Sequence, residues 1–380
     1  MVNRLIILGG HIQALGLARQ AWQKGMVVDL ITNDKCSVAR WSRVVRKTYF
    51  CCNHNEKMEI IKRIATQESM LFPTSDEDIE FLIANRTELE QLAYVALSEN
   101  SIVEMFANKR LSYQFAERND IPHPRSYYPN TFKDVEHISL EITYPCVVKP
   151  AVMYSFHALF GKKAYLCHTR EELCVCVRMV VEKRFPIDHL LIQEYLSGGA
   201  KSLFSFGTYA VNGVSIVDIQ VNRIRQNPMD FGNSTTFCVT CQYPEIDAQA
   251  RRILQMTKYS GMAEIEFMYD KGEYKFLEIN TRAWKWHTIS NQRGFSFIGA
   301  WIDYLNNNSI KKGTSRQAAW EERLTDYTVI LKEWFHGRMR ITSVLESLKQ
   351  KKEYAVWHCR DPLPAIMYVL LSPVLYIKRY

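Results

Sequence analysis

Residues 261–282 read GMAEIEFMYDKGEYKFLEINTR, and the alternation of apolar and polar residues predicts two β-strands joined by a turn. On the second strand, Glu278 and Asn280 lie two residues apart, so their side chains project from the same face. Oxygen-bearing side chains at this spacing suit a hard cation such as Mg²⁺.

The length of the turn decides whether Glu266, on the first strand, joins these two residues. A three-residue loop over 270–272, with glycine in the left-handed position, places Glu266 diagonal to Glu278 on one face. An even-length loop places Glu266 on the opposite face. The first arrangement predicts a Mg²⁺ site formed by Glu266, Glu278 and Asn280. The alternative is an ordinary amphipathic hairpin with a solvated outer face, because antiparallel strands commonly carry glutamate there.

The composition is that of a globular protein. The chain has 380 residues, of which 47% are hydrophobic and 23% charged, and this excludes a disordered chain. The length suggests two or three domains. The net charge of +8 fits an anionic ligand or an acidic membrane surface. Nucleic acid is not predicted as a partner, since the sequence has no arginine-rich run and no zinc-finger spacing.

Cysteine usage points to a reducing compartment. Several of the ten cysteines lie in apolar runs, and Cys238 and Cys241 form a CxxC that no second pair follows. Free thiols in the cytosol are therefore favoured over structural zinc or disulfides. The opening MVNRLIILGG is too short for a secretory signal. We therefore predict a cytoplasmic location.

The N-terminal residues predict a parallel α/β sheet. An apolar strand at 4–8 enters Gly9-Gly10, a helical pattern runs through residues 14–22, and a second strand covers residues 26–32. The glycines lie in GGHIQALG, which is not GxGxxG, so a tight turn is favoured over a dinucleotide site. Further on, Ser75 is predicted to cap a helix.

Two lysines occupy positions that predict anion binding. Lys109 lies at the start of a predicted helix that begins at residues 108–110. Lys149 ends the apolar strand in YPCVVKP, where an unpaired ammonium would be costly unless a phosphate or carboxylate met it. A solvated surface lysine is the alternative.

Five short motifs follow one another in an order and spacing that resembles the ATP-grasp superfamily over residues 1–300. They are Lys109 before IPHP at 121–124, the strand ending at Lys149-Pro150, IQEYL at 192–196, EIEF at 264–267 and LEINTR at 277–282. Within this superfamily the chain resembles the carboxylate–amine ligases that include D-aspartate ligases, which carry a stretch similar to Asp230-Phe231-Gly232.

The resemblance implies a fold of the α/β and α+β classes. It implies an N-terminal Rossmann-like (pre-ATP-grasp) α/β domain over residues 1–107. An ATP-grasp domain would follow over 108–310, with two α+β subdomains that grip ATP and a lid subdomain at about 125–195. Beyond the part that the resemblance covers, the amphipathic pattern of residues 316–352 predicts a helical C-terminal extension over 311–380.

The resemblance also implies the roles of individual residues. The phosphates of ATP would be contacted by Lys109 and Lys149. The hinge that reads adenine and ribose would consist of Gln193, Glu194, Tyr195 and Leu196. Mg²⁺, with Mn²⁺ as the alternative ion, would be held by Glu266, Glu278 and Asn280, which requires the odd-length turn. The catalytic residues would be Arg282, acting on the acyl phosphate, and Arg225, preferred over Arg223 for binding phosphate or the acid.

The residues after Lys149 depart from the family pattern. The lid loop is commonly rich in glycine and serine, but here it reads AVMYSFHALFGKKAYL. Lys163 is therefore predicted to replace backbone donors on the phosphates. An apolar partner for the loop is the alternative. Two histidines, His157 in this loop and His287 after Arg282, are candidate bases, with hydrogen-bonded or packed histidines as the alternative.

The activity that the resemblance implies is ATP-dependent joining of a carboxylate to an amine, through an acyl phosphate and with release of ADP and phosphate. The substrates would be small molecules, such as an amino acid or a cell-envelope precursor. Such chemistry requires no protein nucleophile, because lysine, arginine and Mg²⁺ neutralise the developing charge. The alternatives are an inactive nucleotide-binding scaffold and an enzyme similar to carbamoyl-phosphate synthase.

The C-terminal part differs from the rest of the chain in its pattern of charged and apolar residues. Residues 316–352 predict amphipathic helices. Residues 365–377 are apolar apart from one serine, and they precede a basic end. This stretch is too short to span a bilayer. Residues 365–380 are therefore expected either to dock on the protein or to rest peripherally on an anionic membrane.

Overall fold

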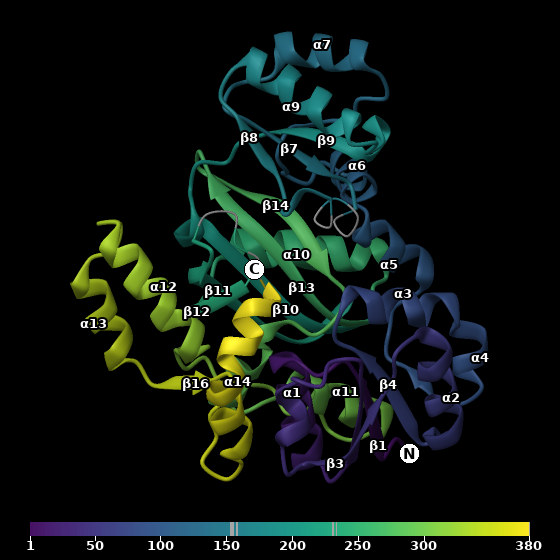
Figure 1. Ribbon diagram of the computed structural model, residues 1–380. Helices are drawn as coiled ribbons and strands as arrows, with labels where there is room; N and C mark the ends of the chain where they lie inside the picture. The colour runs from purple at the N-terminus through teal and green to yellow at the C-terminus, as the bar shows by residue number, and fades with distance from the viewer. Residues whose placement is uncertain (153–155, 157–158, 230–231, 233, 380) are drawn as a thin grey trace. The chain divides into compact units, whose positions relative to one another are not determined.

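The computed structural model describes residues 1–152, 156, 159–229, 232 and 234–379 (Figure 1). The chain divides into two compact units. Unit 1 consists of Met1–Asn100, Ser205–Glu264 and Asn280–Tyr380, and unit 2 of Ser101–Phe204 and Ile265–Ile279. The N-terminal and C-terminal residues thus belong to one unit. The division into domains at 1–107, 108–310 and 311–380 stays a prediction.

The N-terminal sheet of unit 1 is parallel, with the strand order β3-β2-β1-β4-β5. Its strands are β1 (Arg4–Leu8), β2 (Val27–Thr32), β3 (Val45–Phe50), β4 (Ser69–Pro73) and β5 (Tyr94–Val95). The helices of this region are α1 (Ile12–Gln23), α2 (His54–Ile64), α3 (Asp76–Ala84) and α4 (Arg86–Glu90), with the 3-10 helix η1 (Ala39–Trp41).

The glycines after β1 form a tight turn, as predicted. Gly9 has a φ of +96°, and a Cβ there would lie 2.2 Å from Thr74 Oγ1, so a larger residue would be strained and crowded. Ser75 caps α3 as predicted, because its hydroxyl accepts a hydrogen bond from the Asp78 amide at 3.1 Å.

The central sheet has the order β14-β13-β10-β11-β12-β15-β16. Its strands are β10 (Leu203–Val211), β11 (Val214–Asn227), β12 (Ser234–Cys241), β13 (Gly261–Asp270), β14 (Glu273–Asn280), β15 (Ala319–Glu321) and β16 (Lys352–Tyr354). The accompanying helices are α10 (Pro244–Thr257), η4 (Lys285–Arg293) and α11 (Phe297–Leu305). The unit boundaries cut β13 after Glu264 and β14 after Ile279.

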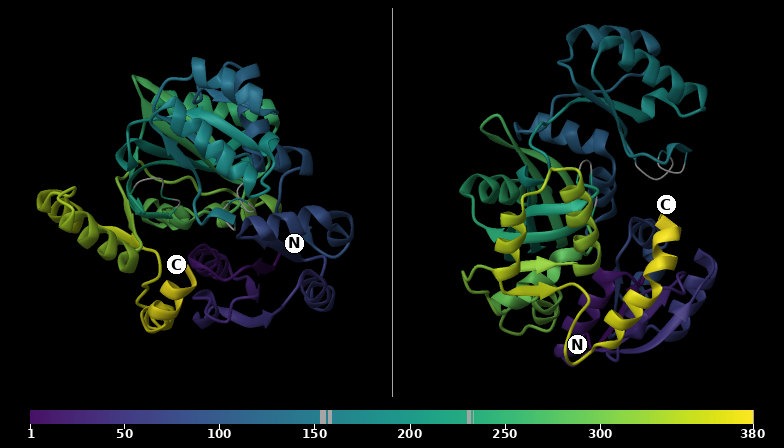
Figure 2. Two further views of the ribbon diagram at one scale, coloured as in Figure 1. Left: turned by 45° about the horizontal axis from the view of Figure 1, so that its top comes forward. Right: turned by 60° about the vertical axis from the view of Figure 1, so that its left-hand side comes forward.

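Unit 2 contains a smaller sheet of order β6-β9-β7-β8. Its strands are β6 (Ser126–Tyr127), β7 (Cys146–Pro150), β8 (Tyr165–Cys167) and β9 (Leu190–Glu194). The helices are α5 (Asn100–Ala107), α6 (Lys109–Arg118), α7 (Phe132–Glu141) and α9 (Arg170–Glu182), with η2 (Ile187–His189) and η3 (Ala200–Ser202). Figure 2 shows α7 and α9 together on one face of this sheet, where Val135, Val148 and Val177 share a buried core.

The C-terminal extension contains α12 (Arg323–Phe335), α13 (Ile341–Lys349) and α14 (Leu363–Arg379). It is not purely helical, which corrects the expectation from the sequence. β15 pairs antiparallel with β12, and β16 pairs parallel with β15, so the extension adds strands to the central sheet. Three-residue strands such as AWE and KEY are too short to give a periodic signal.

Among the described residues, no helix has the length and apolar character needed to cross a bilayer.

Candidate functional site

In unit 2, Lys109 and Glu278 form an ion pair. Asn108 caps α6 by accepting hydrogen bonds from two main-chain amides, and this fixes Lys109 as the first helical residue. Its ammonium binds the Glu278 carboxylate on β14. Burial is the largest single influence on the pKa of Lys109 and would lower it. The charges of Glu278, Tyr113 and Glu266 and the hydrogen bond to Glu278 together outweigh burial, so the pKa is raised. The Glu278 side chain remains 35% exposed, so a ligand is able to reach it.

Three lysines act on the same carboxylate. The pKa of Glu278 is lowered to about 2, chiefly by the charge of Lys109 and against the effect of burial, with smaller contributions from Lys163 and Lys149. Lys149, on β7, places its ammonium 3.3 Å from the Tyr113 hydroxyl and 5.2 Å from the centre of that ring. The structure thus brings together three of the predicted phosphate ligands, and Tyr113 is a neighbour that the sequence did not single out.

The turn of the hairpin differs from the expectation. β13 ends at Asp270 and β14 begins at Glu273, so the turn consists of two residues, Lys271 and Gly272, whose φ values are +49° and +91°. Two successive positive φ angles are typical of a type I′ turn, and the expected three-residue loop is wrong. Tyr269 packs on Tyr274 beside this turn, with ring centroids 4.9 Å apart. The sequence signal was ambiguous because Asp-Lys-Gly fits both loop lengths.

This correction removes the register argument for Glu266. Counted from a two-residue turn, an unbroken ladder places Glu266 and Glu278 on opposite faces. The charges of both residues nevertheless raise the pKa of Lys109, with Glu278 the larger influence. The role of Glu266 as a metal ligand stays a prediction.

The predicted hinge residues follow the end of the small sheet. Gln193 and Glu194 close β9, and Tyr195 and Leu196 come directly after it. Glu194 Oε1 accepts hydrogen bonds from the Lys275 ammonium at 2.6 Å and the Arg125 amide at 3.0 Å. The carboxylate is therefore held in one orientation at the strand end, and Lys275 is a partner that sequence reasoning missed.

In unit 1, Asn280 belongs to a buried polar cluster around Glu264. Asn280 Nδ2 donates to Glu264 Oε2 at 3.2 Å, and Trp286 Nε1 donates to Glu264 Oε1 at 2.7 Å. Burial raises the pKa of Glu264, and the charge of Arg223 opposes this shift. The Asn280 amide is thus oriented with its nitrogen towards Glu264. Sequence reasoning gave Glu264 no role, although it precedes Glu266 by two residues.

The two arginines predicted to be catalytic lie in different surroundings. Arg282 Nε binds the exposed Asp76 carboxylate at 2.6 Å, at the start of α3. Arg225 is 2% exposed, and its Nε and a terminal nitrogen bind the two oxygens of Asp326 on α12 at 2.8 and 2.7 Å. The Arg225 guanidinium also stacks on Phe237 at 4.2 Å. This two-point ion pair indicates that Arg225 fastens α12 to β11. Arg223 is equally buried, at 3% exposed, and its charge acts on Glu264. A substrate-binding role for either arginine stays a prediction.

His287 is buried and neutral, which argues against a role as general base. Its side chain is 0% exposed, and Nε2 lies 3.2 Å from the Gln13 carbonyl oxygen. Burial lowers its pKa to about 4, against a smaller opposing effect of this hydrogen bond.

We expect this depressed pKa of His287 to make the folded protein less stable in acid. Because the unfolded histidine takes up a proton near pH 6.5 and the folded one only near pH 4, the free energy of unfolding should fall by up to about 3 kcal/mol as the pH decreases through this window. Urea unfolding at several pH values should show a weaker pH dependence in His287→Gln than in the exposed control His336→Gln. An equal pH dependence in both variants would contradict the assignment.

Several sequence motifs lie outside the described residues. These are Met153, Tyr154 and His157 of the lid loop, and Asp230 and Phe231 of the DFG-like stretch. Phe156 of the lid loop is among the described residues; it is 0% exposed and packs on Phe160 and Phe185. Cys238 and Cys241 are free thiols. Over the described residues, no three His, Cys, Asp or Glu side chains gather as metal ligands.

Comparison with known sequences identifies relatives. The sequence model of the family described as "Carbamoyl-phosphate synthase L chain, ATP binding domain" matches residues 108–298, which are 191 of the 380 residues. The D-aspartate ligase of Enterococcus faecium (strain Aus0004) is 23% identical over 297 residues, covering 73% of this chain and 70% of that protein. The carbamoyl phosphate synthase large chain of Methanothrix thermoacetophila is 24% identical over 266 residues, but this chain spans only 24% of its length.

Solved structures share the fold. The biotin carboxylase domain of 2-oxoglutarate carboxylase from Hydrogenobacter thermophilus, in complex with MgADP and bicarbonate, has a TM-score of 0.67 at 16% identity, covering 84% of this chain and 74% of that one. N5-carboxyaminoimidazole ribonucleotide synthetase from Thermus thermophilus has a TM-score of 0.64 at 13% identity, covering 83% and 82%. The chain has the ATP-grasp fold and belongs to the family of the carbamoyl-phosphate synthase L chain ATP-binding domain.

Proposed function

We propose that this protein is an ATP-dependent ligase that joins a carboxylate to an amine through an acyl phosphate. Family membership supports the coarser assignment, an ATP-dependent ligase that forms a carbon–nitrogen bond. The observation that carries the proposal is the group of lysines around Glu278, because phosphoryl transfer needs positive charge and an ionised metal ligand close together.

The residues present fit a magnesium nucleotide. Lys109, Lys149 and Lys163 would contact the phosphates, and residues 193–196 would bind adenine and ribose. Glu278 is ionised at neutral pH, because its pKa is only about 2, so its carboxylate suits Mg²⁺. Glu266 and Asn280 would join it, with phosphate oxygens completing the shell. Bound Mg²⁺ would neutralise negative charge on the phosphates, and Mn²⁺, which takes the same ligands, is the alternative.

The remaining polar residues would act on the acid and the acyl phosphate. Arg282 would stabilise charge on the acyl phosphate, and its contact with the exposed Asp76 is of the surface type that contributes little and exchanges readily. Arg223, rather than Arg225, would bind the acid or the released phosphate. The amine would then displace phosphate, with positioning and fixed charge supplying most of the rate enhancement.

The match to the Enterococcus faecium D-aspartate ligase covers 70% of that protein, and it supports an amino acid as one substrate. A second candidate function is supported by the matching family model and by the carbamoyl phosphate synthase relatives. In that case bicarbonate would be the acid and ammonia the amine.

ADP release from Mg-ATP tests both candidates. We expect release only when an acid and an amine are supplied together, from a panel of amino acids and small carboxylic acids. Release with bicarbonate and ammonia alone would favour the second candidate. No release with any pair, in protein that still binds Mg-ATP, would identify an inactive nucleotide-binding scaffold and overturn the proposal.

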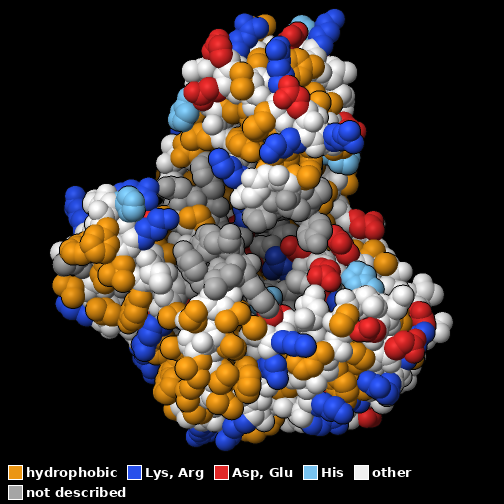
Figure 3. Space-filling model, in the orientation of Figure 1, with side chains coloured by type: hydrophobic (Ala, Val, Ile, Leu, Met, Phe, Trp, Pro, Cys, Tyr) orange, Lys and Arg blue, Asp and Glu red, His pale blue; other side chains and the backbone are white. Residues whose placement is uncertain are grey.

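We also propose that the protein acts in the cytoplasm and that α14 rests peripherally on anionic lipid. All ten cysteines are free thiols, which suits a reducing compartment. One face of α14 packs on the rest of unit 1 through Tyr368, which is 7% exposed and donates a hydrogen bond to Glu322. Apolar side chains elsewhere on α14 are exposed, and they are Leu363, Ile366, Val369, Leu370 and Val374. Figure 3 shows hydrophobic side chains gathered over the part of the surface where Figure 1 draws α14.

Removing two of these apolar side chains should release the protein from lipid. We expect Ile366→Ser/Leu370→Ser to lower the fraction that sediments with phosphatidylserine-containing vesicles by about fivefold or more, because less apolar surface enters the bilayer. Val175→Ser, on the exposed face of α9, is the control. Equal sedimentation of both variants, or equal binding to phosphatidylcholine vesicles, would refute this surface.

A further inference from the structure

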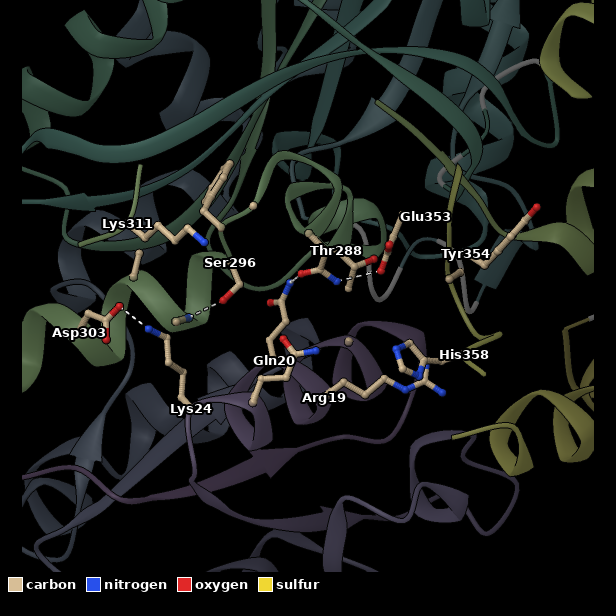
Figure 4. Close-up of a pocket in the computed structure, with 18 of the residues that line it drawn as sticks. Arg19, Gln20, Lys24, Thr288, Ser296, Asp303, Lys311, Glu353, Tyr354 and His358 are labelled. Atoms are coloured by element: carbon tan, nitrogen blue, oxygen red, sulfur yellow. Dashed lines mark hydrogen bonds and ion pairs between the residues drawn. The ribbon is translucent and has the colours of Figure 1, made fainter. Parts of the chain in front are cut away.

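Unit 1 contains a polar cavity of about 500 Å³ (Figure 4). The second half of α1 forms one wall, and η4, α11 and the residues around β16 form the others. None of the residues assigned above to ATP, Mg²⁺ or the acid lines it. Gly16 lets the walls approach closely, because a Cβ there would lie 2.6 Å from Thr288 Cγ2 and 2.7 Å from His287 Nε2. The backbone of α1 at Gly16 therefore packs directly against side chains of η4.

Gln20 brings a buried hydrogen-bond acceptor to this cavity. Its side chain is 1% exposed, and Nε2 donates to Asn291 Oδ1 at 2.8 Å. Within the described part of the chain, Gln20 Oε1 has no hydrogen-bond partner. Figure 4 shows Gln20 rising from α1 towards the middle of the cavity. A buried carbonyl without a donor costs about 1–3 kcal/mol, so a ligand that supplies an N–H group would recover this energy.

Glu353 adds a carboxylate to the cavity. This carboxylate accepts hydrogen bonds from neutral amide side chains. Its oxygens accept from Asn291 Nδ2 at 2.8 Å and Gln292 Nε2 at 3.2 Å. Burial raises the pKa of Glu353, and these two hydrogen bonds and the charge of Arg19 only partly oppose the shift. Over the described residues, no ion pair joins Glu353 to a lysine or arginine. The carboxylate therefore has no close positive charge to offset the cost of burying its negative charge.

The basic residues of the cavity divide into two kinds. Lys24 binds Asp303 at 2.5 Å, and Arg19 is held by Asp361 at 2.9 Å. Lys311 is exposed, and it forms no ion pair among the described residues. Among the side chains that the structure describes, none forms an ion pair with Glu353 or Lys311, so the cavity contains one carboxylate and one ammonium group without a direct counter-charge.

We propose that this cavity binds a small zwitterion of the amino-acid class. Its ammonium group would donate to Gln20 Oε1 and pair with Glu353, and its carboxylate would pair with Lys311. An ammonium group suits the first pair because it donates three hydrogen bonds and carries the charge that Glu353 lacks. A simple cation leaves Lys311 without a partner, and a simple anion leaves Gln20 and Glu353 without one. This site is separate from the residues of the proposed ligase site.

Calorimetric titration of the full chain tests the proposal. The probes are glycine, β-alanine, 4-aminobutyrate and 6-aminohexanoate, which vary the distance between the two charges, with butylamine and butyrate as single-charge controls. We expect one member of the series to bind with a stoichiometry of one, at least about tenfold more tightly than either control, because it makes both charge contacts.

Variants then locate the binding. Glu353→Gln and Gln20→Leu should each weaken it at least about tenfold, and Lys311→Met should remove the preference for the zwitterion over butylamine. Glu278→Gln, in the proposed ligase site, should bind as the wild type does. Melting temperatures of all variants, measured without probe, check the fold.

Two outcomes would overturn the proposal. One is the absence of saturable binding by every member of the series, which would leave the cavity to water. The other is binding that Glu278→Gln abolishes and Glu353→Gln leaves intact, which would move the amino acid to the ligase site. Because ADP release is measured separately, loss of this site and loss of the proposed function are distinguishable.

Discussion

Replacing Glu278 by glutamine should lower ADP release by about 10²–10³-fold or more, because a neutral amide would replace the carboxylate that binds Lys109 and that we propose as a ligand of Mg²⁺. The affinity for Mg-ATP should fall as well. The carboxylate is ionised at every pH at which the protein is folded well, since its pKa is about 2. Activity between pH 5 and 8 should therefore show no titration that belongs to this group.

The control for this variant lies on the same hairpin. Glu273→Gln changes an exposed glutamate at the start of β14 and should leave ADP release within about twofold of the wild type. Circular dichroism and the melting temperature verify that both variants fold. If Glu278→Gln retained wild-type ADP release, neither the metal site nor its role with Lys109 would stand.

The same pair also contributes to stability in acid. Because the folded pKa of Glu278 lies below its ordinary value of 4.5, the stabilisation by Lys109 is present above about pH 4.5 and is lost as the pH falls towards 2. Between pH 4.5 and 2, the free energy of unfolding of the wild type should therefore decrease more steeply with falling pH than that of Glu278→Gln.

Replacing Arg225 by methionine should destabilise the protein by about 3–5 kcal/mol, because it leaves Asp326 as a buried charge without a partner. Both side chains are almost fully buried, at 3% and 0% exposed, and Asp326 also accepts a hydrogen bond from Thr236 at 2.8 Å. Denaturant unfolding measures the change. ADP release per folded molecule should remain close to that of the wild type.

Arg251 provides a matched control for this prediction. It also pairs with two carboxylates, Asp247 and Asp218, but its side chain is 43% exposed. Arg251→Met should therefore cost less than about 1 kcal/mol. If Arg225→Met unfolded like the wild type and lost ADP release, the catalytic role first inferred from the sequence would be correct, and the structural role assigned here would be wrong.

Local sequence predicted the elements whose signals are local. The strand at Arg4–Leu8, the tight turn at Gly9 and the cap at Ser75 were found where the sequence placed them. Each depends on a few neighbouring residues: an apolar run, a positive φ that suits glycine, and a hydroxyl beside a helix start. The ordered motifs also predicted the family, because matches spread over many residues rarely coincide by chance.

The sequence placed Lys109, Lys149, Lys163 and Glu278 in one functional set, and the structure describes them as one electrostatic group in unit 2. It did not separate Arg223 from Arg225, which are two residues apart on β11. Their roles depend on Asp326 and Glu264, which lie far from them along the chain. Strand alternation says nothing about which distant side chain will meet each arginine.

The chain by itself determined the first strand–turn–helix–strand unit, the family motifs and the lysine set, because these follow from residue types at short and fixed spacings. Only the tertiary structure decided the two-residue turn after Asp270, the burial of Arg225 against Asp326 and the cavity that contains Gln20 and Glu353. These features arise where segments far apart in sequence pack together. Burial and long-range charge then fix what each side chain is able to do.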